Sequence, residues 1–168
     1  MMPALYTASV PVFLHYFERI EGLVARTGGD AALLRGQLAP DMFTAGQQMA
    51  TAVNFALRVA YPLAGRAVPV AGDYAPDAPG VMARLRAAET ALNALDPVEF
   101  EGAETRLIRH RAGFAELEQT GTDFLHLFGM PNFLFHTCMA FAVLRAGGLE
   151  IGKADFDGQH DYPHGFRF

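Results

Sequence analysis

The sequence predicts an all-α fold in which four long helices pack as a bundle. Two observations carry this prediction: apolar residues recur at three- and four-residue spacing, and prolines and glycines stand at the ends of those stretches. The stretches are about 9–26, 41–63, 79–95 and 123–145. Connections of unequal length join them, as in a four-helix bundle. An irregular helical domain with a small β appendage is the alternative.

The first two stretches have clear starts and stops. Ser9 can cap the first helix, and Gly28 with its neighbouring glycine ends it. Asp41 is the expected N-cap of the second helix. Pro62 falls in the last turn of that helix, and Gly65 is placed to terminate it.

The second half of the chain is less regular. Pro97 ends the third helix, and the helical period weakens from 100 to 118. An irregular excursion is expected there, or a short hairpin between Thr105 and Leu117. The last helix reaches Gly129 and restarts at Pro131. Its helical spacing predicts an inward face made of Phe135, Met139, Ala142 and Val143. We expect an extended remainder, and a single domain over 1–168 with its core at about 7–158 and a tail at 159–168.

The composition excludes several classes of protein. The chain has 168 residues, 51% of them apolar, and a net charge of −5 with scattered Lys and Arg. This distribution argues against a nucleic-acid binder and against a polybasic membrane patch. The start of the chain lacks the basic residues of a secretory signal, and no apolar run approaches the roughly 20 residues of a membrane helix. We therefore expect a cytoplasmic protein without membrane or nucleic-acid partners.

The single cysteine, Cys138, excludes an intrachain disulfide. Its aromatic and methionine neighbours predict a small, buried core residue rather than a reactive thiol.

His136 is the residue most able to carry chemistry. It lies in an apolar part of the last helix, and Asn132 precedes it by one turn on nearly the same face. A buried imidazole needs hydrogen-bond partners, so the histidine either lines a cavity as a general base or ligand, or fixes helix packing. The packing role is the more common one.

The spacing of the histidines does not predict a metal site. Two histidines at i and i+4 would converge on one ion, but Ala140 follows His136 at that distance and Asn132 precedes it. His160 and His164 have the spacing, yet they stand in the predicted tail.

A polar line follows the second helix opposite its apolar stripe. Gln47, Thr51, Asn54 and Arg58 recur at helical spacing. Such a line is usually a solvated face, and it would matter for function only if it turned toward His136. The sequence has no phosphate-binding glycine loop and no serine nucleophile elbow.

Several short motifs occur in a recognisable order. They are Ser9-Val10-Pro11-Val12-Phe13, Leu38-Ala39-Pro40-Asp41-Met42-Phe43, Leu63-Ala64-Gly65, Gly102-Ala103-Glu104, Pro131-Asn132-Phe133-Leu134-Phe135-His136, Leu144-Arg145 with Gly148, and Ile151-Gly152-Lys153-Ala154-Asp155-Phe156-Asp157-Gly158. This series resembles the bacterial family known as domain of unknown function 1993, from Ser9 to Gly158.

The resemblance implies a place in the DinB/YfiT-like superfamily of putative metalloenzymes. It implies a four-helix bundle with a crossover connection and frequent dimerisation. Characterised relatives include metal-dependent enzymes, some of them thiol S-transferases, whose ion is held by three histidines. One histidine comes from the second helix and two from an HxxxH pair on the last helix.

That histidine triad does not carry over to this chain. The stretch 41–63 contains no histidine, Ala140 stands four after His136, and Ala146 stands where the family often has a histidine after Leu-Arg. A divalent metal would need another set, such as His136 with Asn132 and a carboxylate, which is weak for zinc. We therefore expect no cofactor and no metal ligands.

Two hypotheses for function remain. In the first, a small-molecule pocket in the bundle centres on His136 and Asn132 as catalytic residues, with Gln47, Asn54 and Asp155 converging on them to bind substrate. In the second, the chain is a non-catalytic homodimeric bundle with a structural or interaction role. That hypothesis predicts a packed core, a histidine with only structural partners, and an apolar outer face.

Overall fold

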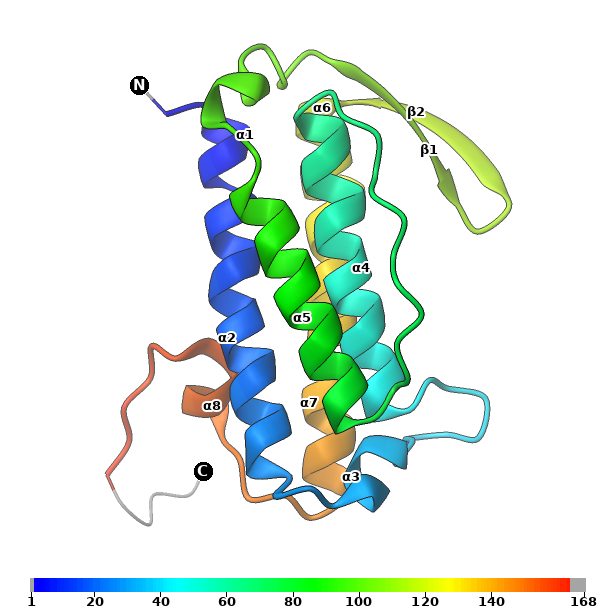
Figure 1. Ribbon diagram of the computed structural model, residues 1–168, viewed down its shortest axis with the longest axis vertical. Helices are drawn as coiled ribbons and strands as arrows, with labels where there is room; N and C mark the ends of the chain where they lie inside the picture. The colour runs from blue at the N-terminus through cyan, green and yellow to red at the C-terminus, as the bar shows by residue number, and fades with distance from the viewer. Residues whose placement is uncertain (1, 164–168) are drawn as a thin grey trace.

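The computed structural model describes residues 2–163 of the chain. Within that range, four long helical runs lie side by side (Figure 1). They are α2 (Val10–Arg26), α4 (Ala45–Leu63), α5 (Ala78–Asn93), and a last run made of α6 (Gly121–Asp123), the π-helix η2 (Phe124–Gly129) and α7 (Met130–Ala146). Shorter helices are α1 (Ala4–Thr7), α3 (Ala31–Arg35), the 3-10 helix η1 (Pro97–Phe100) and α8 (Lys153–Asp157). The prediction of a mostly helical fold is confirmed.

A two-stranded sheet projects from one end of the helices (Figure 1). Strands β1 (Leu107–Ala112) and β2 (Ala115–Thr120) are antiparallel, in a register that pairs Leu107 with Thr120. Gly113 supplies the left-handed conformation of the tight turn, with φ of 61°. Of the two expected alternatives, an irregular excursion or a hairpin, the structure has the hairpin, and it runs three residues past Leu117. The fold is mostly helical rather than strictly all-α.

The helices α4 and α5 run in the same direction because the connection 64–77 returns alongside α4 (Figure 1). Their beginnings meet at Gly46, where a Cβ atom would stand 2.0 Å from the carbonyl oxygen of Pro76. Their ends meet where the Tyr61 hydroxyl donates to the carbonyl oxygen of Ala91 at 3.1 Å. The connection therefore spans the full length of the helix pair.

Thr44, rather than Asp41, caps α4. The Thr44 hydroxyl oxygen accepts from the backbone N–H of Gln47 at 3.2 Å, and the Gln47 side chain accepts from the backbone N–H of Thr44 at 2.9 Å. This reciprocal capping box satisfies two N–H groups at once, whereas a lone aspartate satisfies one. The predicted cap at Asp41 is wrong, and that residue is exposed before the helix begins.

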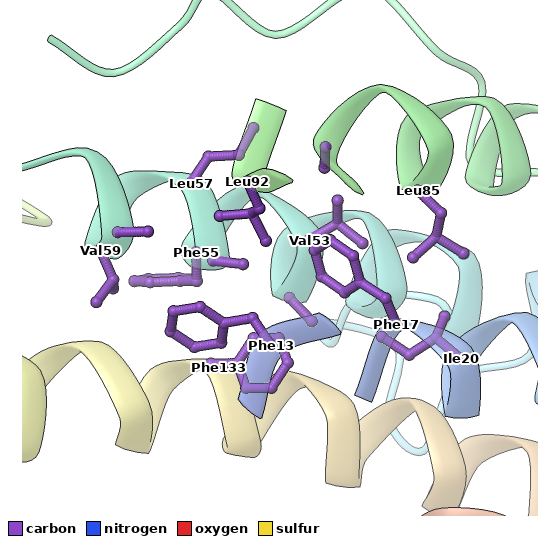
Figure 2. Close-up of a cluster of buried hydrophobic side chains, with 14 of the residues drawn as sticks. Phe13, Phe17, Ile20, Val53, Phe55, Leu57, Val59, Leu85, Leu92 and Phe133 are labelled. Carbon is purple, nitrogen blue, oxygen red and sulfur yellow. The ribbon is translucent and has the colours of Figure 1, made fainter. Parts of the chain in front are cut away.

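The core lies where α2, α4, α5 and α7 face one another (Figure 2). The rings of Phe13 and Phe133 meet edge to face, with centroids 4.8 Å apart. Val53 and Leu85 bring α4 and α5 into the same cluster, and all four side chains are buried. Burying an apolar side chain of this size stabilises the fold by about 1.5–3 kcal/mol, so this cluster holds the helices in place.

The outer side of α7 corrects two predictions. Cys138, expected in the core, is exposed, and Phe135, expected to point inward, is 52% exposed. The helix turns Phe133, Thr137 and Leu144 to the core instead. These positions recur at helical spacing, so residues 135 and 138 fall on the opposite side.

The predicted extended remainder is also partly wrong, since α8 forms a short helix against α2. Its first turn is closed by Asp155, whose side chain accepts from the backbone N–H of Gly152 at 2.7 Å.

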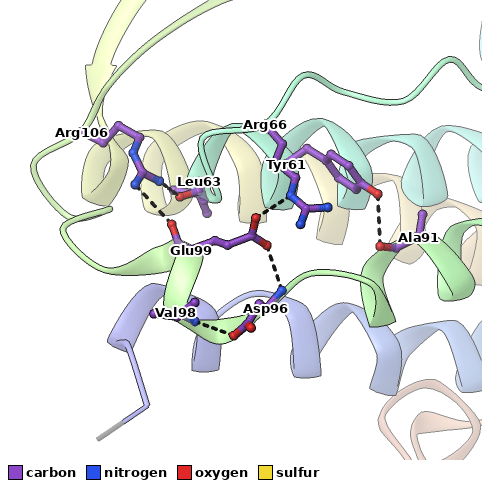
Figure 3. Close-up of polar contacts among 8 residues, drawn as sticks. All are labelled: Tyr61, Leu63, Arg66, Ala91, Asp96, Val98, Glu99 and Arg106. Carbon is purple, nitrogen blue, oxygen red and sulfur yellow. Dashed lines mark hydrogen bonds and ion pairs between the residues drawn. The ribbon is translucent and has the colours of Figure 1, made fainter.

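A polar network closes the end of α4 that lies near the hairpin (Figure 3). The Arg106 guanidinium donates to the carbonyl oxygens of Leu63 and Glu99, and Arg66 pairs with the Glu99 carboxylate at 2.6 Å. The hydrogen bond from Arg66 holds the pKa of Glu99 below its usual value. The last carbonyl of α4, which has no partner inside the helix, is thus satisfied by a side chain.

The last helical run is apolar around much of its circumference. Gly121–Ala146, 26 residues within the described part of the chain, is long and apolar enough to cross a membrane by length and composition alone. Its most apolar window has a mean hydropathy of 1.5, and one third of that window is buried. Leu127 and Phe135 are large apolar side chains of this run that stay exposed.

Candidate functional site

His136 lies on α7 and is joined to α4 by one hydrogen bond. Its ring nitrogen Nδ1 is 2.7 Å from the side-chain oxygen of Gln48, which is itself 2% exposed. An amide oxygen only accepts hydrogen bonds, so Nδ1 carries the ring proton in this contact. The hydrogen bond therefore fixes both the orientation and the tautomer of the imidazole.

Aromatic rings surround the imidazole on two sides. Phe55 of α4 lies nearly parallel to it, with ring centroids 5.5 Å apart and an angle of 23° between the planes. Phe43, before α4, is also nearly parallel at 6.3 Å, while Phe135 meets it edge-on at 5.1 Å. Phe55 is buried, but Phe43 and Phe135 are about half exposed. The site is therefore apolar on its inner side and open on its outer side.

Burial lowers the pKa of His136 below its ordinary value of 6.5, so the imidazole is neutral at pH 7. With the proton on Nδ1, the lone pair is on Nε2. None of residues 2–163 forms a hydrogen bond with that nitrogen, and it is not sealed from solvent. The geometry presents one free proton acceptor at an apolar, half-open surface.

Asn132, predicted as a partner of His136, is engaged within its own helical run. Its amide nitrogen donates to the carbonyl oxygen of Phe128 at 2.7 Å. That carbonyl belongs to the π-helix η2, where the regular helical hydrogen-bond ladder is interrupted. The side chain thus repairs the junction where the sequence predicted a restart of the helix.

The structure does not bring the three predicted substrate-binding residues to His136. Gln47 takes part in the capping box of α4. Asn54 accepts from the Arg84 guanidinium of α5 at 2.7 Å, and Asp155 pairs with Arg26 of α2 at 2.9 Å. Each of these side chains is therefore engaged by another partner, and none forms a hydrogen bond with His136 among residues 2–163.

Gln48 and Phe43 are the neighbours of His136 that sequence reasoning missed. Gln48 is a polar residue on the buried side of α4, among Ala45, Met49 and Ala52. A buried glutamine needs partners for its amide, so its place within an apolar stripe was the available signal.

The donors around His136 do not fit a metal ion. No three His, Cys, Asp or Glu side chains come together as a metal site in residues 2–163. Gln48 and Asn132 offer carboxamides that already have hydrogen-bond partners, and transition metals prefer imidazole, thiolate or carboxylate ligands. His160 contacts Asp157 at 2.5 Å, and its predicted partner His164 lies outside the described residues.

Comparisons with known proteins identify the family. The sequence model of the family described as "Domain of unknown function (DUF1993)" matches residues 5–157. No curated protein matches the chain. Among solved structures, the crystal structure of a DinB family member protein from Shewanella denitrificans is similar, with 25% sequence identity and a TM-score of 0.83. The similarity covers 95% of this chain and 94% of that one. The chain therefore belongs to the DUF1993 family and has the fold of a DinB family member.

Proposed function

We propose that this protein binds a small molecule at His136, whose Nε2 accepts a hydrogen bond from a ligand hydroxyl. The observation that carries the proposal is the 2.7 Å contact between His136 Nδ1 and the Gln48 side-chain oxygen. That contact assigns the free lone pair to the ring nitrogen that faces solvent. A histidine needed only for packing gains nothing from a free, oriented acceptor.

The surroundings of His136 define the chemical class of ligand. Phe43 and Phe135 offer half-exposed rings next to the imidazole, which favours a planar or otherwise apolar body. No side chain that is charged at pH 7 forms a hydrogen bond or ring contact with the imidazole among residues 2–163. The best match is an uncharged aromatic or apolar compound that bears a hydroxyl group.

The site has the elements of a general base without a metal. The neutral imidazole is the form that accepts a proton. Because burial lowers the pKa of His136, the ring stays neutral to a lower pH than an exposed histidine would. The resemblance to the DinB/YfiT-like superfamily supports this location. In the metal-dependent enzymes of that superfamily, the second long helix and the last helix hold the metal-binding histidines. Here those two helices contribute Gln48 and His136.

A pair of fluorinated probes tests the proposal by 19F NMR. 4-Fluorophenol carries the hydroxyl, and fluorobenzene has a similar ring without it. We expect the resonance of 4-fluorophenol to broaden in the presence of the protein, and that of fluorobenzene to broaden less. His136→Gln should abolish the difference, because a glutamine does not present the acceptor at the same place.

His126→Gln is the matched control, since it removes an exposed histidine from the same helical run. It should leave the broadening of 4-fluorophenol unchanged. Equal broadening of both probes, or an unchanged response in His136→Gln, contradicts the proposal.

A second proposal, of a homodimer, follows from the apolar outer face of the last helical run. Leu127 is 70% exposed, and Pro131, Phe135 and Cys138 continue its line at three- and four-residue steps. A helix that is apolar on both its inner and outer sides has a second surface to bury. Two copies of one helix face give a self-complementary interface, which favours a twofold dimer.

Size-exclusion chromatography with light scattering tests the dimer. The wild-type chain should elute with twice the monomer mass of 18.2 kDa, and the double variant Leu127→Glu, Cys138→Glu should elute as a monomer. Val70→Glu, at a 99% exposed position on the connection, is the control and should stay dimeric. A monomeric wild type, or binding of this face to lipid vesicles in place of self-association, contradicts the dimer.

A further inference from the structure

A small cavity lies on the other side of α4 from His136, between α4, α5 and the connection 64–77. Its volume is about 110 Å³, which is room for several water molecules. Asn54 and Leu57 line it from α4, Arg84 and Ala88 from α5, and Tyr74 from the connection. Most of its other lining residues are Ala, Val or Pro, so the cavity combines an apolar wall with one cation.

The cation, Arg84, lacks an acidic partner. It forms no ion pair with any carboxylate in residues 2–163, whereas Arg26, Arg66 and Arg109 all do. Among the described residues, its hydrogen-bond partner is the neutral amide oxygen of Asn54. A guanidinium stays charged at all relevant pH values and has five N–H donors, so most of its binding capacity is unused.

One of those donors is buried without a partner. The Nε atom of Arg84 is shielded from solvent and forms no hydrogen bond in the described part of the chain. A buried polar group that has lost its water and found no partner destabilises the protein. The guanidinium is thus incompletely paired, and an anion in the cavity can form charged hydrogen bonds with its remaining N–H groups, which are the stronger kind.

Tyr74 supplies a second polar group to the same cavity. Its ring lies over the guanidinium of Arg84, 5.2 Å from the guanidinium carbon. Its hydroxyl has no hydrogen-bond partner among residues 2–163. Gly72 makes this position possible, because a Cβ there would stand 2.8 Å from the tyrosine ring. The connection thus holds an aromatic donor beside the unpaired cation.

The connection is held firmly at one end and exposed in its middle. Gly46 and Gly80 admit the backbone of Pro76 and Ala75, so the end near α5 packs tightly. Val70, in the middle, is 99% exposed and adds no packing that would hold this part down. A ligand can therefore enter beneath the middle of the connection while Tyr74 stays near Arg84.

We propose that this cavity binds the carboxylate of a small organic acid with a short apolar chain. The carboxylate pairs with Arg84 and accepts from the Tyr74 hydroxyl, and the chain contacts Leu57 and Ala88. One guanidinium matches the single charge and flat shape of a carboxylate. A phosphate dianion carries two charges, whereas the lining of the cavity has one cation to match them. The site is separate from His136 and does not depend on its proposed function.

Butyrate is a suitable probe, and butyramide is its uncharged control of nearly the same shape. In a 1H–15N NMR titration of the wild-type protein, we expect butyrate to shift the backbone resonances of Tyr74 and Ala88 with millimolar affinity. Butyramide should shift them at least tenfold less at equal concentration. Arg84→Gln should weaken butyrate binding at least tenfold, because the charge is lost while the hydrogen bond to Asn54 can persist.

Arg86→Gln is the matched control, because it removes an exposed arginine from the same helix and should leave binding unchanged. Ala87→Leu fills the cavity from an exposed helix position and should block butyrate while keeping Arg84, so it decides the matter if Arg84→Gln does not fold. Three results overturn the proposal: no butyrate shifts at these residues, undiminished binding in both variants, or shifts with inorganic phosphate but not with butyrate.

Discussion

His136 can exchange a proton with solvent or a ligand at one ring nitrogen only, because Gln48 occupies the other. Protonating that ring places a charge in a partly buried aromatic setting formed by Phe55 and Phe43. Phe rings offer no hydrogen bond, and burial penalises the charged form. The same contacts therefore link the proposed chemistry of the site to the stability of the fold.

The lowered pKa of His136 predicts how stability changes with pH. Between its folded pKa and the ordinary value of 6.5, the unfolded chain binds more protons than the folded one. The contribution of His136 to the free energy of unfolding therefore rises with pH through that window and is level above it. We expect wild type to lose more stability than His136→Gln between pH 7.5 and pH 5, as measured by urea unfolding. Equal losses in the two proteins would contradict the pKa shift.

Substituting Gln48 by glutamate should reverse that shift. A carboxylate beside Nδ1 favours the imidazolium, so Gln48→Glu is expected to raise the pKa of His136 above that of the wild type. An NMR titration of the His136 ring carbon resonances measures this directly. Gln47→Glu, one residue away in the capping box, is the control and should change that pKa far less. A pKa unaltered by Gln48→Glu would remove Gln48 as the partner of the ring.

At the scale of one residue, the sequence singles out His136 as a candidate but does not identify its hydrogen-bond partner. His136 stands out because it is a histidine in an apolar helix. Its partner is 88 positions away in the chain and belongs to a different helix. Helical periodicity describes one helix at a time, so Gln47 and Gln48 look alike until the rotation of α4 against α7 is known.

Among the elements, α4 shows how a helix start is chosen. Thr44 and Gln47 form a reciprocal capping box, and Asp41 lies ahead of it. Thr44→Ala should lower the free energy of unfolding by about 1 kcal/mol, because it leaves a backbone N–H of the first turn unpaired. Asp41→Ala is the control and should change it by less than about 0.5 kcal/mol, as exposed substitutions usually do. The two urea midpoints decide between the caps, and a larger loss at Asp41 would contradict the structure.

The last helical run could be predicted in its extent but not in its orientation. Prolines and glycines mark its ends, whereas its apolar residues occur on all sides and give no unique inner face. This is why Cys138 and Phe135 were expected in the core and are exposed. A helix of this kind is oriented by its neighbours, here mainly by α4.

Across the whole molecule, the packing of α4 against both α7 and α5 decides where the two proposed sites lie. The resemblance to a family implied a crossover, but periodicity alone does not give helix directions. In the structure, α4 offers its buried side to α7, with Gln48 at His136, and its other side to α5, with Asn54 at Arg84. One helix therefore separates two sites of different chemistry.

The close approach of the connection to α4 gives a prediction for the fold as a whole. A Cβ at position 46 would stand 2.0 Å from the carbonyl oxygen of Pro76, and neither backbone can move without shifting a helix end. Gly46→Ala should therefore lower the free energy of unfolding by about 1–3 kcal/mol, although alanine favours helices. Gly22→Ala is the matched control, because nothing lies within 4 Å of its Cβ on the exposed side of α2.

At position 22, alanine should raise the free energy of unfolding by about 0.5–1 kcal/mol, since a helical glycine costs more backbone entropy than alanine. Urea unfolding of the two variants against wild type gives both signs, provided that the dependence on urea is unchanged. Opposite signs for the two glycines follow only if the connection 64–77 packs onto the start of α4. A stabilised Gly46→Ala protein would show that the crossover takes another path, and it would also move Tyr74 away from Arg84.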